Sequence, residues 1–186
     1  MGIGEVTRAV FLDRDGVLNL PVVREGKPYP PGSVDQLEVY PDAANALARL
    51  REAGYLLIVV TNQPDVARGT QTRRAVEDIN AALGAQLPID EFLVCWHDDW
   101  DACDCRKPKP GLVLRGAATH SVDLARSFLI GDRWRDIDCG AAAGVRSVLI
   151  DRGYHERGPE VAPAHIAKTL GGAVEWVLSV TDRTTA

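Results

Sequence analysis

The sequence lacks any long basic run and any apolar run long enough to cross a membrane. Its 186 residues include 21 Lys and Arg against 26 Asp and Glu, a net charge of -5. Nothing therefore favours nucleic acid or an anionic membrane as a partner. The apolar stretches end well before the roughly 20 residues that a bilayer requires. Residues 1–7 lack a basic start followed by an apolar stretch, so we expect no signal peptide and a cytoplasmic location.

Cysteine is scarce, but three of the four cysteines, Cys95, Cys103 and Cys105, fall close together. In a reducing compartment such a cluster indicates a metal site before a disulfide. The fourth, Cys139, falls in a predicted helix, where we expect a small core residue.

Apolar strands and amphipathic helices alternate along the chain. Strands are predicted at residues 9–12, 55–60, 92–95, 127–130 and 146–150. Helices are predicted at residues 41–53, 71–83, 110–119 and 134–143, followed by an edge strand at 166–170 and a last helix at 173–180. This alternation indicates an α/β fold, a Rossmann-like doubly wound parallel sheet. Composition and length suit a single domain over residues 1–186, and we expect a monomer.

Residues 20–36 are rich in Pro and Gly and are predicted to form a loop. A loop of this length is uncommon inside a compact domain and is often a lid or a binding loop. We therefore expect residues 20–36 to help select the substrate.

Polar side chains follow three of the predicted strands directly: Asp13 and Asp15, Thr61 and Asn62, and Asp132. In parallel sheets, ligands bind at the carboxyl ends of the strands. Carboxylates there suit Mg²⁺, and a carboxylate can also attack phosphorus to form an aspartyl-phosphate. The alternative for a lone Asp-x-Asp is a turn or a helix cap.

Four segments resemble, in order, the motifs of the haloacid dehalogenase superfamily of phosphatases. They are residues 13–19 (Asp-Arg-Asp-Gly-Val-Leu-Asn), 61–63 (Thr-Asn-Gln), 106–108 (Arg-Lys-Pro) and 131–136, which begins Gly-Asp-Arg and ends in Asp136. The resemblance extends over residues 9–154 and implies an enzyme on the fold expected above.

The resemblance also implies roles for individual residues. Asp13 would be the nucleophile and Asp15 the general acid and base. Thr61 and the backbone near Asn62 would hold the phosphoryl oxygens, and Lys107 would neutralise charge in the transition state. Mg²⁺ would be held by Asp13, the backbone carbonyl of Asp15, and Asp132. For Asp136, support of the site and an ordinary charge on a helix face remain open.

Cys95, His97, Cys103 and Cys105 supply three thiolates and one imidazole within a short loop, residues 95–105. Such a set suits tetrahedral Zn²⁺, and four protein ligands leave no open position, so we expect a structural zinc. Buried apolar cysteines with a chance histidine are the alternative. The loop leads directly into Arg106 and Lys107, so fixing the loop would fix both cations.

This loop resembles the zinc-containing branch of the superfamily, which includes phosphatases of D-glycero-D-manno-heptose 1,7-bisphosphate and of histidinol phosphate. That branch lacks a large cap domain, and no insertion in this chain is long enough to form one. Substrate selection would then fall to residues 20–36, residues 64–70 and the zinc loop.

Two substrates remain open, and we favour removal of the 7-phosphate of the heptose bisphosphate. Residues 66–69 (Val-Ala-Arg-Gly) resemble the heptose enzymes, and Arg68 and Arg106 would bind the second phosphate. Residues 64–65, Pro-Asp, depart from the Ser-Gly expected there.

The short zinc loop favours histidinol phosphate instead, because only five residues separate His97 from Cys103. Asp98, Asp99 and Asp101 would then attract an ammonium group. A third possibility is a zinc-stabilised binding module without catalysis, but the candidate catalytic residues are all present.

Overall fold

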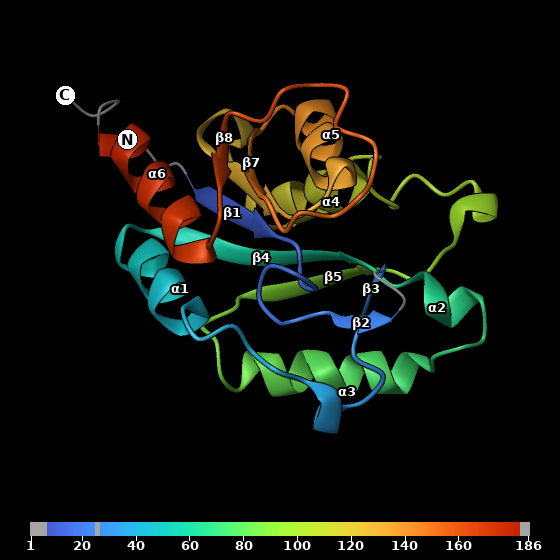
Figure 1. Ribbon diagram of the computed structural model, residues 1–186. Coiled ribbons are helices and arrows are strands. Elements are labelled where there is room, and N and C mark those ends of the chain that lie inside the picture. The colour runs from blue at the N-terminus through green and yellow to red at the C-terminus, as the bar shows by residue number, and fades with distance from the viewer. Residues whose placement is uncertain (1–6, 25–26, 183–186) are drawn as a thin grey trace.

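A six-stranded parallel sheet organises the computed structural model, which describes residues 7–24 and 27–182 (Figure 1). The strands in spatial order are β5 (Glu91–Cys95), β4 (Tyr55–Asn62), β1 (Arg8–Leu12), β6 (Phe128–Gly131), β7 (Arg146–Ile150) and β8 (His165–Ala167). Chain order reverses at β1, which lies between β4 and β6. Ligands bind at this kind of switch point in open α/β sheets.

Helices cover both faces of the sheet. They are α1 (Ala43–Glu52), α2 (Pro64–Ala67), α3 (Arg73–Gly84), α4 (Gly111–His120), α5 (Trp134–Ala143) and α6 (Leu170–Asp182). Val10 and Leu12 belong to a core cluster with side chains of α1, α3 and α6, and Ala9 and Phe11 to a second cluster with α4 and α5. Because both faces of β1 are buried, its run is continuously apolar, as expected for a central parallel strand. The predicted α/β fold is confirmed.

The prediction of a plain loop at residues 20–36 is wrong in part. β2 (Val22–Arg24) pairs antiparallel with β3 (Lys27–Tyr29), and a 3-10 turn, η1 (Val34–Gln36), follows. Val22 and Val23 favour strand geometry. Pro28 is tolerated because both strands of a two-stranded sheet are edges. The high Pro and Gly content of residues 20–36 is typical of a loop, so the sequence alone did not predict this hairpin.

The short helix α2 and two 3-10 turns, η2 (Asp99–Asp101) and η3 (Leu124–Arg126), were not predicted. Most of the other differences lie at element ends. The edge strand expected at 166–170 ends at Ala167, and Leu170 already begins α6, where it is fully buried. β4 continues through Thr61 and Asn62. Within the described residues no insertion is large enough to form a cap domain, and no helix is both long and apolar enough to cross a membrane. The prediction that there is no signal peptide rests on residues 1–7, of which residues 1–6 lie outside the described part of the chain.

Candidate active site

A cavity of about 280 Å³ opens at the carboxyl ends of β1, β4 and β6. The predicted site residues gather in it: Asp13, Asp15, Thr61, Asn62, Arg68, Arg106, Lys107 and Asp132 all line its wall. Pro28 and Tyr29 of the β2–β3 hairpin also line the cavity. The segment at 20–36 therefore does reach the site, as a hairpin rather than as a loop.

Lys107 lies between two carboxylates at the base of this cavity. Its Nζ is 2.8 Å from Asp13 Oδ1 and 2.6 Å from Asp136 Oδ1, and its side chain is only 3% exposed. Burial opposes the charged ammonium, but the carboxylates of Asp13 and Asp136 outweigh it and raise the pKa of Lys107. Lys107 is therefore a buried cation rather than a solvated surface lysine.

Three carboxylates, from Asp13, Asp132 and Asp136, have oxygens within 4.8 Å of one another. Burial raises the pKa of Asp13 to about 6, although Lys107 acts in the opposite direction. Burial, and then the Asp13 charge, also raise the pKa of Asp132, and its Oδ1 is buried without a hydrogen-bond partner. One ammonium does not balance three buried carboxylates, so the cluster fits a divalent cation with oxygen ligands.

Asp136 has a definite place in this cluster. It is 1% exposed, and its second oxygen accepts the backbone N–H of Arg133 at 3.1 Å. It caps the start of α5 while its first oxygen receives Lys107. Of the two possibilities left open for Asp136, the geometry supports the one at the site.

Two glycines allow the carboxylates to approach the backbone. Gly16 has φ +86°, and a Cβ there would lie 1.8 Å from Asp132 Oδ2. A Cβ on Gly131 would lie 2.2 Å from that of Asp136. Any side chain at either position would displace a carboxylate of the cluster.

The carboxylate of Asp15 is held by three neighbouring side chains. Arg14, fully buried, donates Nε and Nη2 to it; Asn19 Nδ2 donates at 3.0 Å and Gln63 Nε2 at 2.9 Å. The same Gln63 nitrogen also donates to Thr61 Oγ1 at 2.9 Å. Arg14, Asn19 and Gln63 were not predicted as separate site residues. The available signal was that polar residues stand where burial is expected.

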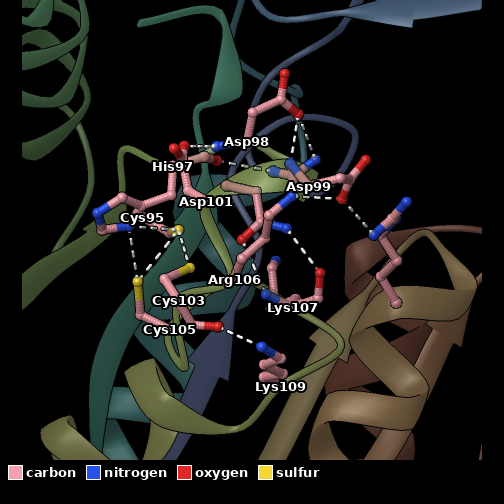
Figure 2. Close-up of polar contacts among 12 residues, drawn as sticks. Cys95, His97, Asp98, Asp99, Asp101, Cys103, Cys105, Arg106, Lys107 and Lys109 are labelled. Carbon is pink, nitrogen blue, oxygen red and sulfur yellow. Dashed lines mark hydrogen bonds and ion pairs between the residues drawn. The ribbon is translucent and has the colours of Figure 1, made fainter. Parts of the chain in front are cut away.

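The zinc-loop residues converge as predicted (Figure 2). Cys95 Sγ lies 3.2 Å from Cys105 Sγ and 3.8 Å from Cys103 Sγ, and His97 Nδ1 lies 3.3 Å from Cys105 Sγ. Burial raises the pKa of the Cys95 thiol. Thiol ligands must ionise to bind metal, so a cation at this point would be needed to hold the thiolates. Three sulfurs and one ring nitrogen at these separations fit tetrahedral Zn²⁺.

The side chain of Asn62, at the end of β4, forms hydrogen bonds with the backbone of Lys107, just after the zinc loop. Its Nδ2 donates to the Lys107 carbonyl and its Oδ1 accepts the Lys107 N–H, both at 3.1 Å. The end of β4 thus sets the backbone that carries Lys107. The amide oxygen and one of the two amide hydrogens of Asn62 are therefore committed to the backbone of Lys107.

Four arginines line the cavity, each with an acidic partner. Arg68 contacts Asp98 and Asp65; Arg106 and Arg135 both contact Asp99; and Arg133 lies 2.6 Å from Glu156. Figure 2 shows the Arg106–Asp99 contact beside the zinc loop. Arg133 and Arg135 were not predicted as site residues. The available signal was their position at the start of α5, where Arg133 is the N-cap that follows Asp132 and Arg135 lies on the first turn.

Similarity to known proteins agrees with this geometry. A family model described as HAD-hyrolase-like matches residues 104–173. The chain is 32% identical over 191 residues to D-glycero-D-manno-heptose-1,7-bisphosphate 7-phosphatase of Chlorobaculum tepidum, covering 91% of this chain and 94% of the relative. It is 32% identical over 184 residues to D-glycero-beta-D-manno-heptose-1,7-bisphosphate 7-phosphatase of Salmonella typhi, covering 92% and 89%.

A solved structure shares the fold over nearly the whole chain. The D,D-heptose 1,7-bisphosphate phosphatase from B. bronchiseptica, complexed with magnesium and phosphate, superposes with a TM-score of 0.78 at 29% identity. The match covers 94% of this chain and 99% of that one. Together with the relatives above, this match shows that the chain belongs to the haloacid dehalogenase-like family of phosphatases.

Proposed function

We propose that the protein removes the 7-phosphate of D-glycero-D-manno-heptose 1,7-bisphosphate by way of an aspartyl-phosphate on Asp13. The observation that carries the chemistry is the placement of Asp13 in the cavity, 2.8 Å from the buried ammonium of Lys107, with Asp15 also on the cavity wall. A nucleophile, a fixed cation and an acid–base group thus share one cavity.

In the first step an Asp13 oxygen attacks phosphorus and the bond from phosphorus to the sugar oxygen breaks. Asp15 gives its proton to that oxygen, so the sugar leaves as an alcohol. In the second step Asp15 takes a proton from water, whose oxygen attacks phosphorus, and the bond to Asp13 breaks to release phosphate. Thr61, together with the backbone near Asn62, orients the phosphoryl oxygens, and Lys107 balances their negative charge.

Mg²⁺, when bound by Asp13, the Asp15 carbonyl and Asp132, would supply further positive charge for the phosphoryl oxygens. Asp136 lies within the same acidic cluster and holds Lys107 from the other side. Zn²⁺, held by Cys95, His97, Cys103 and Cys105, would fix the loop that carries Arg106 and Lys107.

The cationic wall of the cavity supports a substrate with a second phosphate. Arg68, Arg106, Arg133 and Arg135 all line the cavity besides Lys107, and guanidinium groups suit phosphate oxygens. The named relatives act on a heptose bisphosphate. Both observations favour a phosphorylated sugar.

The short zinc loop keeps histidinol phosphate as a second candidate. Against it, of the three aspartates expected to attract an ammonium group only Asp99 lines the cavity. Each of the three is also engaged by a neighbouring group. Asp98 contacts Arg68, Asp99 contacts Arg106, and Asp101 accepts the backbone N–H of Asp98. A non-catalytic module is disfavoured because the chain belongs to a phosphatase family and its candidate catalytic groups lie together.

The test is phosphate release with Mg²⁺ from both anomers of the heptose bisphosphate and from histidinol phosphate, measured side by side. ³¹P NMR of the product shows which phosphate leaves. We expect higher kcat/KM for the bisphosphate, with the 7-phosphate lost. Faster turnover of histidinol phosphate would refute the proposed substrate, and no release from any phosphomonoester would refute the proposed chemistry.

A further inference from the structure

Asp98 is a charged side chain buried next to a proposed zinc ligand, His97. Its side chain is 0% exposed. A buried carboxylate is costly unless it is paired and hydrogen-bonded. Asp98 is not part of the acidic cluster at Asp13 and contributes no atom to the zinc-binding set. Its burial therefore requires a different explanation.

The partners of Asp98 provide that explanation. Arg68 donates Nε to Asp98 Oδ2 and Nη2 to Asp98 Oδ1, the second at 2.8 Å. The Asp99 N–H donates to Asp98 Oδ1 at 2.7 Å, and Arg106 Nη2 lies 3.7 Å from the same oxygen. The hydrogen bond from Arg68 lowers the pKa of Asp98. The carboxylate thus receives a two-point fork from an arginine 30 residues away in the sequence.

Arg68 is the C-cap of α2 and lines the cavity that contains Asp13. Its side chain is 40% exposed, in contrast to that of Asp98. Of the five N–H groups of a guanidinium, two are taken by Asp98, and Nη1 donates one to Asp65 at 3.3 Å. Two N–H groups of Arg68 therefore remain available, and Asp98 of the zinc loop fixes the orientation of the guanidinium.

We propose that Asp98 is a positioning residue that holds Arg68 ready for the phosphate group of the substrate that is not hydrolysed. The inference rests on the proposed function, since it assumes a bisphosphate substrate. The zinc loop would then position two cations. Lys107, just after the loop, contacts the phosphate that is cleaved, and Asp98, within the loop, orients Arg68 toward the phosphate that is retained.

A merely structural role for Asp98 predicts a different result. If Asp98 only stabilised the zinc loop, its loss would disturb Lys107 as well and would slow all phosphomonoesters alike. If it positions Arg68, its loss affects chiefly the substrate with a second phosphate. D-glycero-D-manno-heptose 7-phosphate, which lacks only the 1-phosphate, is the matched probe.

The experiment measures kcat and KM of the full-length enzyme for the 1,7-bisphosphate and for the 7-phosphate. Asp98→Asn keeps the shape of the side chain and an oxygen for the Asp99 N–H but removes the charge. We expect the ratio of kcat/KM between the two substrates to fall about tenfold to a hundredfold, mainly through KM for the bisphosphate. Arg68→Gln should lower this ratio similarly. The ratio should fall little further in the double variant, because Asp98 and Arg68 act through the same contact between Arg68 and the second phosphate.

Asp78→Asn is the control, because Asp78 pairs with Arg74 on the exposed surface of α3 at 2.9 Å. It should leave both substrates unaffected. Zinc content of each variant shows whether the loop has kept its metal. Arg68→Gln provides the answer if Asp98→Asn loses zinc or does not fold.

An unchanged ratio in Arg68→Gln, or in zinc-containing Asp98→Asn, overturns the positioning role while the proposed function stands. A wild-type enzyme that does not prefer the bisphosphate over the 7-phosphate also overturns the positioning role alone. Faster turnover of histidinol phosphate than of the bisphosphate overturns the proposed substrate and the positioning role together.

Discussion

Lys107 Nζ lies 2.8 Å from Asp13 Oδ1, and this contact joins two segments 94 residues apart. It brings the proposed nucleophile and the proposed charge-neutralising cation together before any substrate binds. Fixed charges of this kind stabilise a transition state without needing to reorganise during the reaction.

Asp13→Asn should reduce phosphate release to background, because an amide oxygen is a poor nucleophile compared with a carboxylate. The fold should persist, since the substitution keeps the shape of the side chain. Phosphate release and far-UV circular dichroism measure the two effects. Substantial residual turnover in a folded variant would show that another group attacks phosphorus.

Lys107→Met should lower kcat by about 10²–10³. It should also lower the free energy of unfolding by about 3–5 kcal/mol without Mg²⁺, since two buried carboxylates lose their cation. Urea unfolding measures the second effect. Lys168→Met, at a surface pair with Asp151 whose lysine side chain is 77% exposed, should change stability by less than about 0.5 kcal/mol. Equal effects of the two variants would contradict the buried role of Lys107.

Gln63→Leu should impair proton donation by Asp15, because Gln63 bridges Asp15 and Thr61 at 2.9 Å on each side. Loss of kcat should be about tenfold greater for a sugar phosphate than for p-nitrophenyl phosphate, whose leaving group needs little protonation. Gln86→Leu, at an exposed position just after the C-terminal end of α3, is the matched control. Equal losses on both substrates would indicate a structural role only.

Cys103→Ser should release zinc and lower kcat/KM, because three ligands cannot complete a tetrahedral structural site. Cys139→Ser should keep zinc: burial raises the pKa of Cys139 to about 12, and it lies outside the ligand set. Metal analysis of the purified proteins compares the two. Wild-type protein without zinc, or equal zinc loss in both variants, would refute this ligand set.

Mg²⁺ should raise the melting temperature of the wild-type protein, because it binds the folded acidic cluster. At a Mg²⁺ concentration 100 times the dissociation constant, the free energy of unfolding should rise by about 2.7 kcal/mol. Asp132→Asn should remove most of this gain, since Asp132 Oδ1 is a buried oxygen without a partner. Calorimetry with and without Mg²⁺ makes the measurement. A gain that survives the substitution would exclude Asp132 as a ligand.

The sequence by itself determined the features that depend on neighbouring residues. The alternation of strands and helices follows from local periodicity, so the α/β class was correct and most errors lay at element ends. The Cys/His cluster proposed to bind zinc could be predicted because Cys95 and Cys105 belong to one short loop. The carboxyl ends of β1, β4 and β6 could be grouped because parallel strands end at the same edge of a sheet.

Only the tertiary structure decided which distant side chains pair. The Arg68–Asp98 fork, the Gln63 bridge to Asp15 and the burial of Asp136 against Lys107 depend on how loops from different strands meet. No spacing or periodicity encodes such contacts, because their energy comes from desolvation and geometry across the assembled site. The same holds for the β2–β3 hairpin, where pairing between two short segments outweighed a composition typical of a loop.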